Sequence, residues 1–214
     1  MQFLNDPEEI TRRSFEIICS EVDLSALPED VRRIVVRIVH SCGMTAIVDA
    51  LRIDPGLYET VRAALSDGRP ILVDSEMTRA GIIRRFLPPG AQVICKLNDA
   101  DTIETAQRLG VTRTAAAVAH WRPLLKEAVC VIGNAPTALF TLLEMIDNGA
   151  PKPCAIIAFP VGFVGAAESK EELDKNPRGA QIATLLGRLG GAGMAAAALN
   201  AITSMAAEAG AWTS

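Results

Sequence analysis

Hydrophobic residues recur near the start of the chain at the three- and four-residue spacing of amphipathic helices. The segments 7–19 and 28–39 each begin with a proline followed by acidic residues, a pattern that favours the first turn of a helix. In the second segment the apolar positions form one stripe, and arginines lie mostly on the other side. We therefore expect two helices, with His40 at the end of the second, just before Gly43.

Short apolar runs then alternate with helical patterns along the rest of the chain. The expected strands are 71–73, 93–95, 129–132 and 155–159, and the expected helices are 58–66, 78–86, 101–109, 114–125 and 136–148. A glycine-rich run, 187–193, precedes an alanine-rich helix at 195–211. This alternation predicts an α/β fold with a mainly parallel sheet flanked by helices, in a single domain over residues 1–214. Ligands are expected beyond the carboxyl ends of the strands.

Composition and charge narrow the classes of partner. Half of the residues are hydrophobic and the net charge is −4, so the chain has no overall electrostatic attraction for nucleic acid or an anionic membrane. Five cysteines without a Cys-x-x-Cys pair are interpreted as buried free thiols in a reducing cytoplasm. The segment from Met1 to Pro7 lacks the pattern of a secretory signal, and the apolar run 154–165 is too short to span a bilayer. We predict a cytoplasmic protein.

The two histidines are the first candidates for chemistry. The negative end of a helix dipole favours a protonated imidazole, so His40 is predicted to donate a proton. A helix-end residue without a chemical role remains the alternative, and His120 is interpreted as a packing residue. Cys42 is a weaker candidate for thiol catalysis. No spacing of histidines, cysteines or aspartates is typical of a metal site, so no metal is expected.

Three turns are candidates for binding anions. The turn 133–137 follows an expected strand and opens an expected helix, so its backbone N–H groups are positioned to bind a carboxylate or phosphate, although an ordinary strand-to-helix turn fits the spacing equally well. Arg113 lies between two threonines before another expected helix, and Arg178 lies on the turn 176–179. Together these residues outline a site for a polyanion in an acidic protein.

Six segments stand out in order along nearly the whole chain: His40–Met44, Asp74–Ile82, Thr112–Thr114, Gly133–Leu139, Phe159–Val164 and Asn176–Gly179. Together they resemble the precorrin-8X methylmutase family of cobalamin biosynthesis. The resemblance implies a homodimer with an active site shared between subunits. It also implies that precorrin-8X becomes hydrogenobyrinic acid when a methyl group moves from ring carbon 11 to carbon 12, a 1,5-sigmatropic shift that needs no cofactor.

The resemblance also assigns roles to residues. His40 matches the family's histidine and is expected to protonate the ring system, while arginines and helix N-termini hold the carboxylates around an apolar macrocycle. The expected contacts with the tetrapyrrole substrate and product are Arg12, Ser14, Met44, Arg79, Thr112, Arg113, Thr114, Asn134, Ala135, Pro136, Thr137 and Arg178, with apolar contacts from 161–163. The sequence departs from the family pattern after Gly179. Substrate contacts from the C-terminal segment are therefore not carried over from the family, whereas the roles of His40 and Arg113 are.

Several alternatives remain open at this stage. A protein that holds a corrinoid without catalysis would use the same arginines and apolar slot. An isomerase acting on cobalt-precorrin-8 would share the same motifs, because both pathway branches use similar enzymes. An unrelated α/β enzyme acting on a nucleotide or phosphorylated metabolite would use the turn 133–137. Hand-over of the product to the next pathway enzyme is a further expected partnership.

Overall fold

The structure is a computed structural model that describes residues 3–212 of the 214-residue chain. The N-terminal segment predicted to lack a secretory signal begins with Met1 and Gln2, and the predicted domain ends with Thr213 and Ser214. These four residues lie outside the described part of the chain. Among residues 3–212, no helix combines the length and the apolar character needed to cross a bilayer.

Within the described residues, six strands form one sheet in the order β1-β6-β5-β4-β2-β3. Five strands run parallel, and β1 pairs antiparallel with β6 at one edge. The strands are β1 (Leu51–Ile53), β2 (Ile71–Val73), β3 (Val93–Cys95), β4 (Val129–Ile132), β5 (Ala155–Ala158) and β6 (Gln181–Leu185). The prediction of an α/β fold with a mainly parallel sheet is confirmed.

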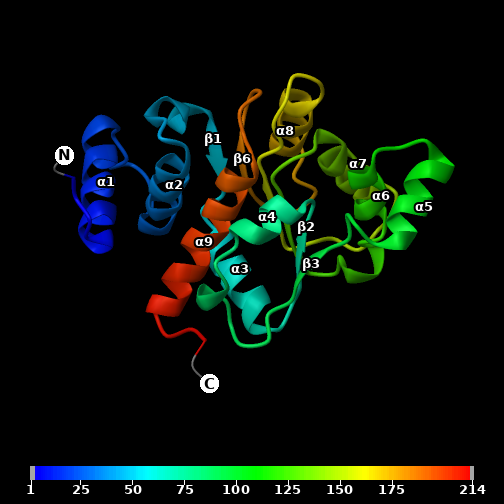
Figure 1. Ribbon diagram of the computed structural model, residues 1–214, viewed down its shortest axis with the longest axis horizontal. Helices are drawn as coiled ribbons and strands as arrows, with labels where there is room; N and C mark the ends of the chain where they lie inside the picture. Colours follow the sequence, from blue (N-terminus) through cyan, green and yellow to red (C-terminus); the bar gives the residue numbers. More distant parts are fainter. Residues whose placement is uncertain (1–2, 213–214) are drawn as a thin grey trace.

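Helices cover both faces of this sheet (Figure 1). One face carries α2 (Glu29–Cys42), α3 (Leu57–Ser66), α4 (Glu76–Gly81) and α9 (Ala192–Glu208), and α1 (Pro7–Glu21) packs outside α2. The other face carries α6 (Arg113–Ala119), α7 (Pro136–Asp147) and α8 (Ala166–Lys175), with α5 (Ala100–Leu109) against α6. Figure 1 shows α1 and α2 at one end of the molecule and α5 and α6 at the other.

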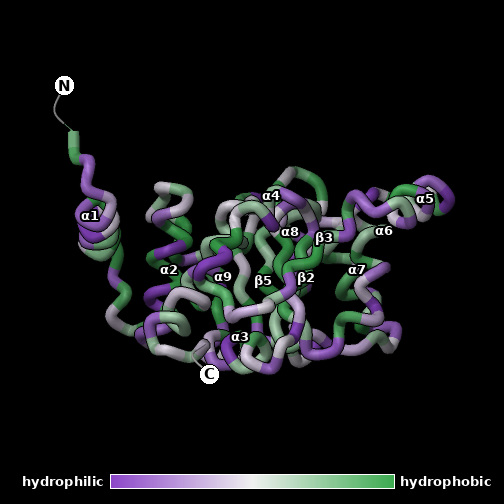
Figure 2. The backbone as a smooth tube through the Cα atoms, turned by 60° about the horizontal axis from the view of Figure 1, so that its bottom comes forward, coloured by the Kyte–Doolittle hydropathy of each residue, from purple (hydrophilic) through white to green (hydrophobic). Residues whose placement is uncertain are grey.

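The central strands are buried on both faces. Val129 and Val131 of β4 pack in the core shared with α9, whereas Cys130 and Ile132 pack in the core shared with α7. This alternation follows from the two-residue period of a strand, and burial on both sides explains why the strand sequences are continuous apolar runs. Figure 2 shows the hydrophobic positions concentrated in the central strands and on the inner helices.

Most of the expected elements are confirmed. Strands β2, β3 and β4 have the predicted bounds, and β5 ends one residue earlier than expected. The two N-terminal helices form as α1 and α2, and Gly43 ends α2 in the left-handed conformation at φ 69°. The short strands β1 and β6 and helix α8 were not predicted. All five cysteines are free, and Cys130 is buried as expected, whereas Cys19 is exposed.

Two predicted helices are wrong in their C-terminal parts. The helix predicted over 78–86 forms earlier, as α4, after the N-cap Ser75, and it ends at Gly81. The Asn200 side chain of α9 accepts a hydrogen bond from the backbone N–H of Ile83 and donates one to the carbonyl of Gly81, which fixes the chain in a non-helical path. The helix predicted over 114–125 stops at Ala119, and a 3-10 turn containing Pro123 follows.

The strand order reverses between β2 and β4. The chain passes from β2 to β3 on one side, then returns to place β4, β5 and β6 on the other side. Open α/β sheets bind ligands beyond the carboxyl ends of the strands at such a reversal. In this chain the residues that follow β2 and β4 at that point are Asp74 and Gly133.

Candidate active site

His40 lies exposed in the last turn of α2, as the sequence predicts. Its ring meets the ring of Phe15 from α1 edge to face, with centroids 5.4 Å apart and an interplanar angle of 86°. The imidazole forms no hydrogen bond or ion pair with any residue of the described range 3–212, so neither ring nitrogen is engaged by another group there. Cys42 points elsewhere, because its thiol donates to the carbonyl of Val39 on its own helix.

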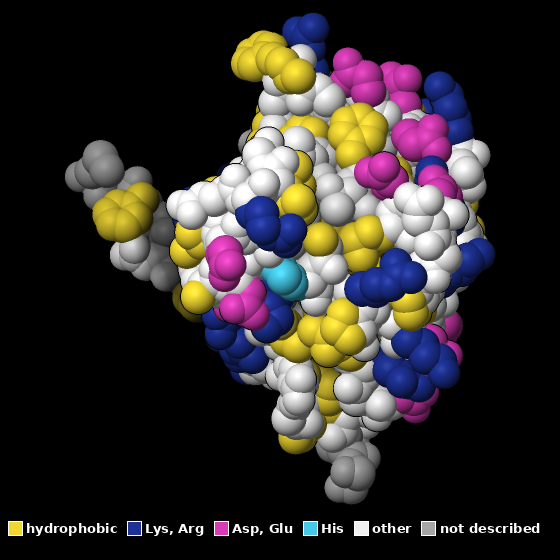
Figure 3. Space-filling model, turned by 90° about the vertical axis from the view of Figure 1, so that its right-hand side faces the viewer, with side chains coloured by type: hydrophobic (Ala, Val, Ile, Leu, Met, Phe, Trp, Pro, Cys, Tyr) yellow, Lys and Arg dark blue, Asp and Glu magenta, His cyan; other side chains and the backbone are white. Residues whose placement is uncertain are grey.

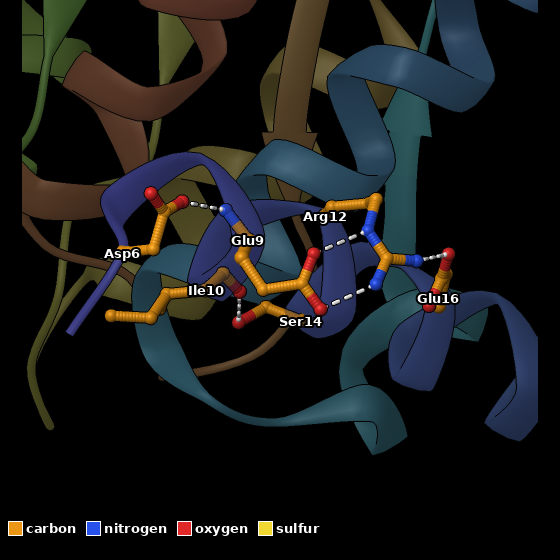
Figure 4. A network of polar contacts seen from close by, with 6 residues as sticks. All are labelled: Asp6, Glu9, Ile10, Arg12, Ser14 and Glu16. Carbon is orange, nitrogen blue, oxygen red and sulfur yellow. Dashed lines mark hydrogen bonds and ion pairs between the residues drawn. The ribbon is translucent and has the colours of Figure 1, made fainter. Parts of the chain in front are cut away.

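A pocket of about 340 Å³ opens beside His40 between α1 and α2. Ser14 and His40 both line it, so the structure brings two of the predicted site residues together. The Ser14 hydroxyl donates to the carbonyl of Ile10 at 2.7 Å (Figure 4), which leaves its oxygen lone pairs available to a ligand donor. Glu21 also lines the pocket and accepts a hydrogen bond from Thr45 at 3.0 Å. The predicted contact residue Met44 is exposed immediately after Gly43.

A second pocket, of about 400 Å³, lies between α1, α2 and α9, and Phe15 lines it. The guanidinium of Arg37 lies over the Phe15 ring, 5.6 Å from its centroid, and lines this pocket. Burial lowers the pKa of the half-buried Arg37, and no carboxylate of the described residues forms an ion pair with it. The sequence prediction missed Arg37. Its position three residues before His40, on the same side of a helix, was the available signal.

Arg12 lies exposed on α1 and is paired within its own helix. Its guanidinium donates to Glu9 at 2.7 Å and to Glu16, both on the same helix (Figure 4). The hydrogen bond with Glu9, followed by that with Glu16, raises the pKa of Arg12. Two carboxylates of its own helix hold this exposed guanidinium, and a contact of Arg12 with the substrate stays a prediction. Arg79 is exposed and lies 3.4 Å from Glu76, a weak surface pair, so its role stays a prediction.

The segment Thr112–Thr114 meets the turn 133–137 at the N-termini of α6 and α7. The hydroxyl oxygen of Thr137 lies 2.8 Å from that of Thr112 and 3.1 Å from that of Thr114. Thr112 also caps α6 by accepting a hydrogen bond from the backbone N–H of Ala115. Arg113 is exposed beside this threonine cluster, and its guanidinium has no partner among the described residues. Two motifs that lie far apart in the sequence therefore form one surface.

Three backbone N–H groups of the turn 133–137 are already occupied. The buried carboxylate of Asp74 accepts hydrogen bonds from the N–H groups of Gly133, Asn134 and Ala135 at 2.9, 2.9 and 3.1 Å. The prediction that these N–H groups bind a ligand carboxylate or phosphate is therefore wrong, and with it the support for a nucleotide at this turn. Pro136 has no N–H, so the side chains of Asn134 and Thr137 remain as the expected contacts.

Arg178 lies at the wrong end of the sheet for the predicted site. It precedes β6, whereas the ligand end of the sheet lies beyond the carboxyl ends of the strands. Its guanidinium makes a bidentate pair with Asp147 at 2.9 and 2.7 Å and donates to Glu172 at 2.8 Å. The hydrogen bond with Asp147 is the main reason that the pKa of Arg178 is raised. The structure therefore gives Arg178 a structural role and removes it from the candidate site.

The loops at the carboxyl ends of the strands expose apolar side chains. Phe163 and Val164 are 84% and 89% exposed, and the guanidinium of Arg188 lies 5.5 Å from the Phe163 ring centroid. In Figure 3, hydrophobic and basic side chains lie side by side at the top of the molecule, the end at which these loops lie in Figure 1. The predicted apolar contact from 161–163 is accessible. His120 is half-buried, and its Nε2 is buried without a hydrogen-bond partner among the described residues.

One chain does not bring His40 and Arg113 together. His40 lies on α2, which covers one face of the sheet near the β1 edge, whereas Arg113 begins α6 on the opposite face. Figures 1 and 2 both show α2 and α6 on opposite sides of the sheet strands. The candidate site of a single chain is therefore divided into a histidine half, His40 with Ser14, Phe15 and Arg37, and an arginine half, Arg113 with the threonine cluster and Asn134.

These two halves define a class of protein. A doubly wound α/β domain presents an accessible histidine beside a basic and aromatic pocket, together with an unpaired arginine at two helix N-termini. Such groups suit a ligand with an apolar body and several carboxylates, with proton transfer as the chemistry at its ring.

This chain was compared with protein families, with curated proteins and with solved structures, and all three comparisons point to one family. The family model "Precorrin-8X methylmutase" matches residues 9–205. The precorrin-8X methylmutase of Pseudomonas aeruginosa is 50% identical over 202 residues, which cover 94% of this chain and 97% of that protein. The cobalt-precorrin-8 methylmutase of Priestia megaterium is 35% identical over 204 residues, 94% of this chain and 88% of that one. A precorrin-8X methylmutase structure from Thermus thermophilus matches with a TM-score of 0.84 at 32% identity, covering 97% of this chain and all of that chain.

The chain belongs to the precorrin-8X methylmutase family, isomerases of cobalamin biosynthesis. The resemblance seen in the six sequence segments is thereby confirmed.

Proposed function

We propose that this protein converts precorrin-8X to hydrogenobyrinic acid in the cytoplasm by moving a methyl group from ring carbon 11 to carbon 12, with His40 as the proton donor. The observation that carries the proposal is the accessible imidazole of His40 at the helix end, in a chain that belongs to this isomerase family. The substrate and product have the same atoms, so the rearrangement uses no external methyl donor and no redox cofactor.

The histidine half suits the protonation step. Proton transfer requires a donor within hydrogen-bond reach of the substrate, and no described residue competes for the imidazole nitrogens of His40. The phenyl ring of Phe15 contacts the imidazole of His40 edge to face, and the guanidinium of Arg37 lies over the same phenyl ring. The unpaired guanidinium of Arg37 would bind a peripheral carboxylate of the macrocycle, because a desolvated arginine is stabilised by an anionic partner.

A homodimer with a shared active site is part of the proposal. Arg113, the threonine cluster and Asn134 lie on the opposite side of the sheet from His40, so one chain offers an incomplete site. A second copy that placed its arginine half against the histidine half would surround the macrocycle. The exposed Ile17, which lines the pocket beside His40, and the exposed Met44 provide hydrophobic surface for the macrocycle or for the second copy.

We propose the metal-free substrate over its cobalt complex. The relative named for precorrin-8X is 50% identical to this chain, whereas the relative named for cobalt-precorrin-8 is 35% identical at the same coverage of this chain. Activity with both substrates, measured side by side, tests this preference.

A corrinoid-binding protein without catalysis is the second candidate, because the same arginines and apolar surfaces would hold the product. Incubation of the purified protein with precorrin-8X, followed by absorption spectroscopy and mass spectrometry, separates the two. Appearance of the corrin chromophore at unchanged mass supports the isomerase. Binding of the pigment without conversion supports the alternative.

A further inference from the structure

Asp74 is the most completely bonded carboxylate at the ligand end of the sheet. Its side chain is fully buried, and its Oδ1 accepts hydrogen bonds from the N–H of Gly133 at 2.9 Å and from the Thr78 hydroxyl at 3.0 Å. Its Oδ2 accepts from the N–H groups of Asn134 and Ala135 at 2.9 and 3.1 Å. Four donors converge on two oxygens, which is the pattern of an acceptor-only carboxylate.

Three consecutive backbone N–H groups before a helix form an anion-binding nest, and the N-terminus of α7 adds the positive end of the helix dipole. Asp74 therefore occupies, from within the protein, the place that a ligand anion takes in many α/β proteins. It does so between β2 and β4, where the strand order reverses. The turn is also closely packed, because a Cβ on Gly133 would lie 2.6 Å from Ala192 and from the hydroxyl of Thr78.

The hydrogen bonds continue from Asp74 to the arginine half of the site. Asp74 fixes the backbone of Asn134 and Ala135, the next residue Pro136 begins α7, and Thr137 then contacts both Thr112 and Thr114 beside Arg113. A single buried carboxylate after β2 thus connects the start of this substrate-facing surface to the sheet, beside the core packing of α7.

We propose that Asp74 is a positioning residue of the methylmutase site: it fills the anion nest at the N-terminus of α7 and thereby presents the Asn134 and Thr137 side chains, rather than backbone N–H groups, to the substrate. The proposal rests on the proposed function for the nature of the substrate. Asp74 does not touch the substrate, so its loss is expected to weaken substrate binding more than it slows the chemical step at His40.

The first test asks whether the nest binds an anion. Asp74→Ala removes the carboxylate and leaves three N–H groups facing a cavity, and sodium formate is the probe. Formate is expected to raise the melting temperature of Asp74→Ala in a saturable way, relative to sodium chloride at the same ionic strength. It is not expected to raise that of the wild type.

Asp54→Ala is the matched control. Asp54 also accepts a hydrogen bond from a backbone N–H, that of Ile182 at 2.8 Å, but at the opposite end of the sheet. Equal changes in the melting temperatures of Asp74→Ala and Asp54→Ala with formate would contradict the claim that residues 133–135 form an anion-binding nest. This test needs no substrate, so it stays informative if the proposed reaction is wrong.

The second test separates positioning from general destabilisation. With precorrin-8X, Asp74→Ala is expected to raise KM about tenfold or more while kcat stays within about threefold of wild type, and formate is expected to lower KM again. An unchanged KM, or a loss confined to kcat, would contradict the positioning role.

If Asp74→Ala does not fold, Thr78→Val tests the positioning role instead, because it removes one of the four donors to Asp74 and keeps the side-chain volume. A KM about threefold above wild type supports the proposal, and an unchanged KM overturns it.

Discussion

The imidazole of His40 meets the phenyl ring of Phe15 edge to face, and the guanidinium of Arg37 lies over the same phenyl ring. One aromatic side chain of α1 thus contacts both the proposed proton donor and the nearest unpaired cation of α2. The imidazole has no hydrogen bond to any residue of 3–212, so packing contacts such as the ring pair with Phe15 restrict its orientation.

Phe15→Leu is expected to lower kcat about fivefold, because an edge-to-face aromatic pair contributes about 1 kcal/mol beyond simple burial. Steady-state kinetics with precorrin-8X measures the change. Phe86→Leu is the matched control, since Phe86 is also half-buried and lies under a guanidinium, that of Arg85, away from His40. Equal kcat values for the two variants would show that Phe15 has no part in orienting His40.

A shared active site predicts complementation between inactive variants. His40→Ala and Arg113→Ala are each expected to have little activity alone. After unfolding and refolding together in equal amounts, they should recover about a quarter of wild-type activity, because about half of the dimers are mixed and each mixed dimer has one intact site. A mixture that stays as inactive as its parts would contradict a site built from two chains.

Arg178→Ala is expected to lower the free energy of unfolding by about 2 kcal/mol, because it removes hydrogen bonds to two carboxylates from a nearly buried guanidinium. KM for the substrate should stay unchanged, since Arg178 lies before β6, away from the ligand end. Urea unfolding and steady-state kinetics test the two halves of this prediction. Arg32→Ala, which removes an exposed pair with Glu29, provides the control and should change stability by less than about 1 kcal/mol.

Lys170 predicts a pH dependence of stability. Its side chain is fully buried in α8 and donates to the carbonyl of Leu189 at 2.5 Å, and burial lowers its pKa from 10.5 to about 8. Between these two pH values the unfolded chain binds a proton that the folded protein does not, so stability rises with pH through this window. Below about pH 8 the full penalty, about 3 kcal/mol, is present.

The comparison that isolates this effect is between wild type and Lys170→Met. The free energy of unfolding of the variant minus that of the wild type should fall by roughly 2 kcal/mol between about pH 7 and about pH 10, because the penalty on Lys170 is mostly relieved at the higher pH. Urea unfolding at the two pH values gives the difference. Parallel pH curves for the two proteins would contradict the lowered pKa of Lys170.

Much of the fold was readable from local patterns. The strands β2, β3 and β4 are continuous apolar runs bounded by turn residues, and α2 has both an acidic first turn and a glycine at its end. The short edge strand β1 was missed because its middle residue, Arg52, interrupts the continuous apolar run that marks β2, β3 and β4. The early end of α4 depends on Asn200, which lies more than a hundred residues away.

The site was predictable only in part, for a similar reason. Resemblance to a family pointed to His40 and Ser14, which share a pocket, and to Thr112 and Thr137, which are in contact. The sequence could not show that the N–H groups of residues 133–135 are bound by Asp74, because Asp74 and Gly133 are 59 residues apart in the sequence. Nor could it show that the guanidinium of Arg178 faces two carboxylates at the amino ends of the strands.

The central claim is that His40 drives a methyl shift on the macrocycle, and the most direct measurement is the absorption spectrum of precorrin-8X incubated with wild type and with His40→Ala. The wild type should form the corrin chromophore. The variant should bind the product with much of the wild-type affinity but leave precorrin-8X unconverted, since the side chain is exposed and its removal leaves the fold intact. Conversion by both proteins would contradict the role of His40, and failure of both to bind or convert the pigment would contradict the proposed function itself.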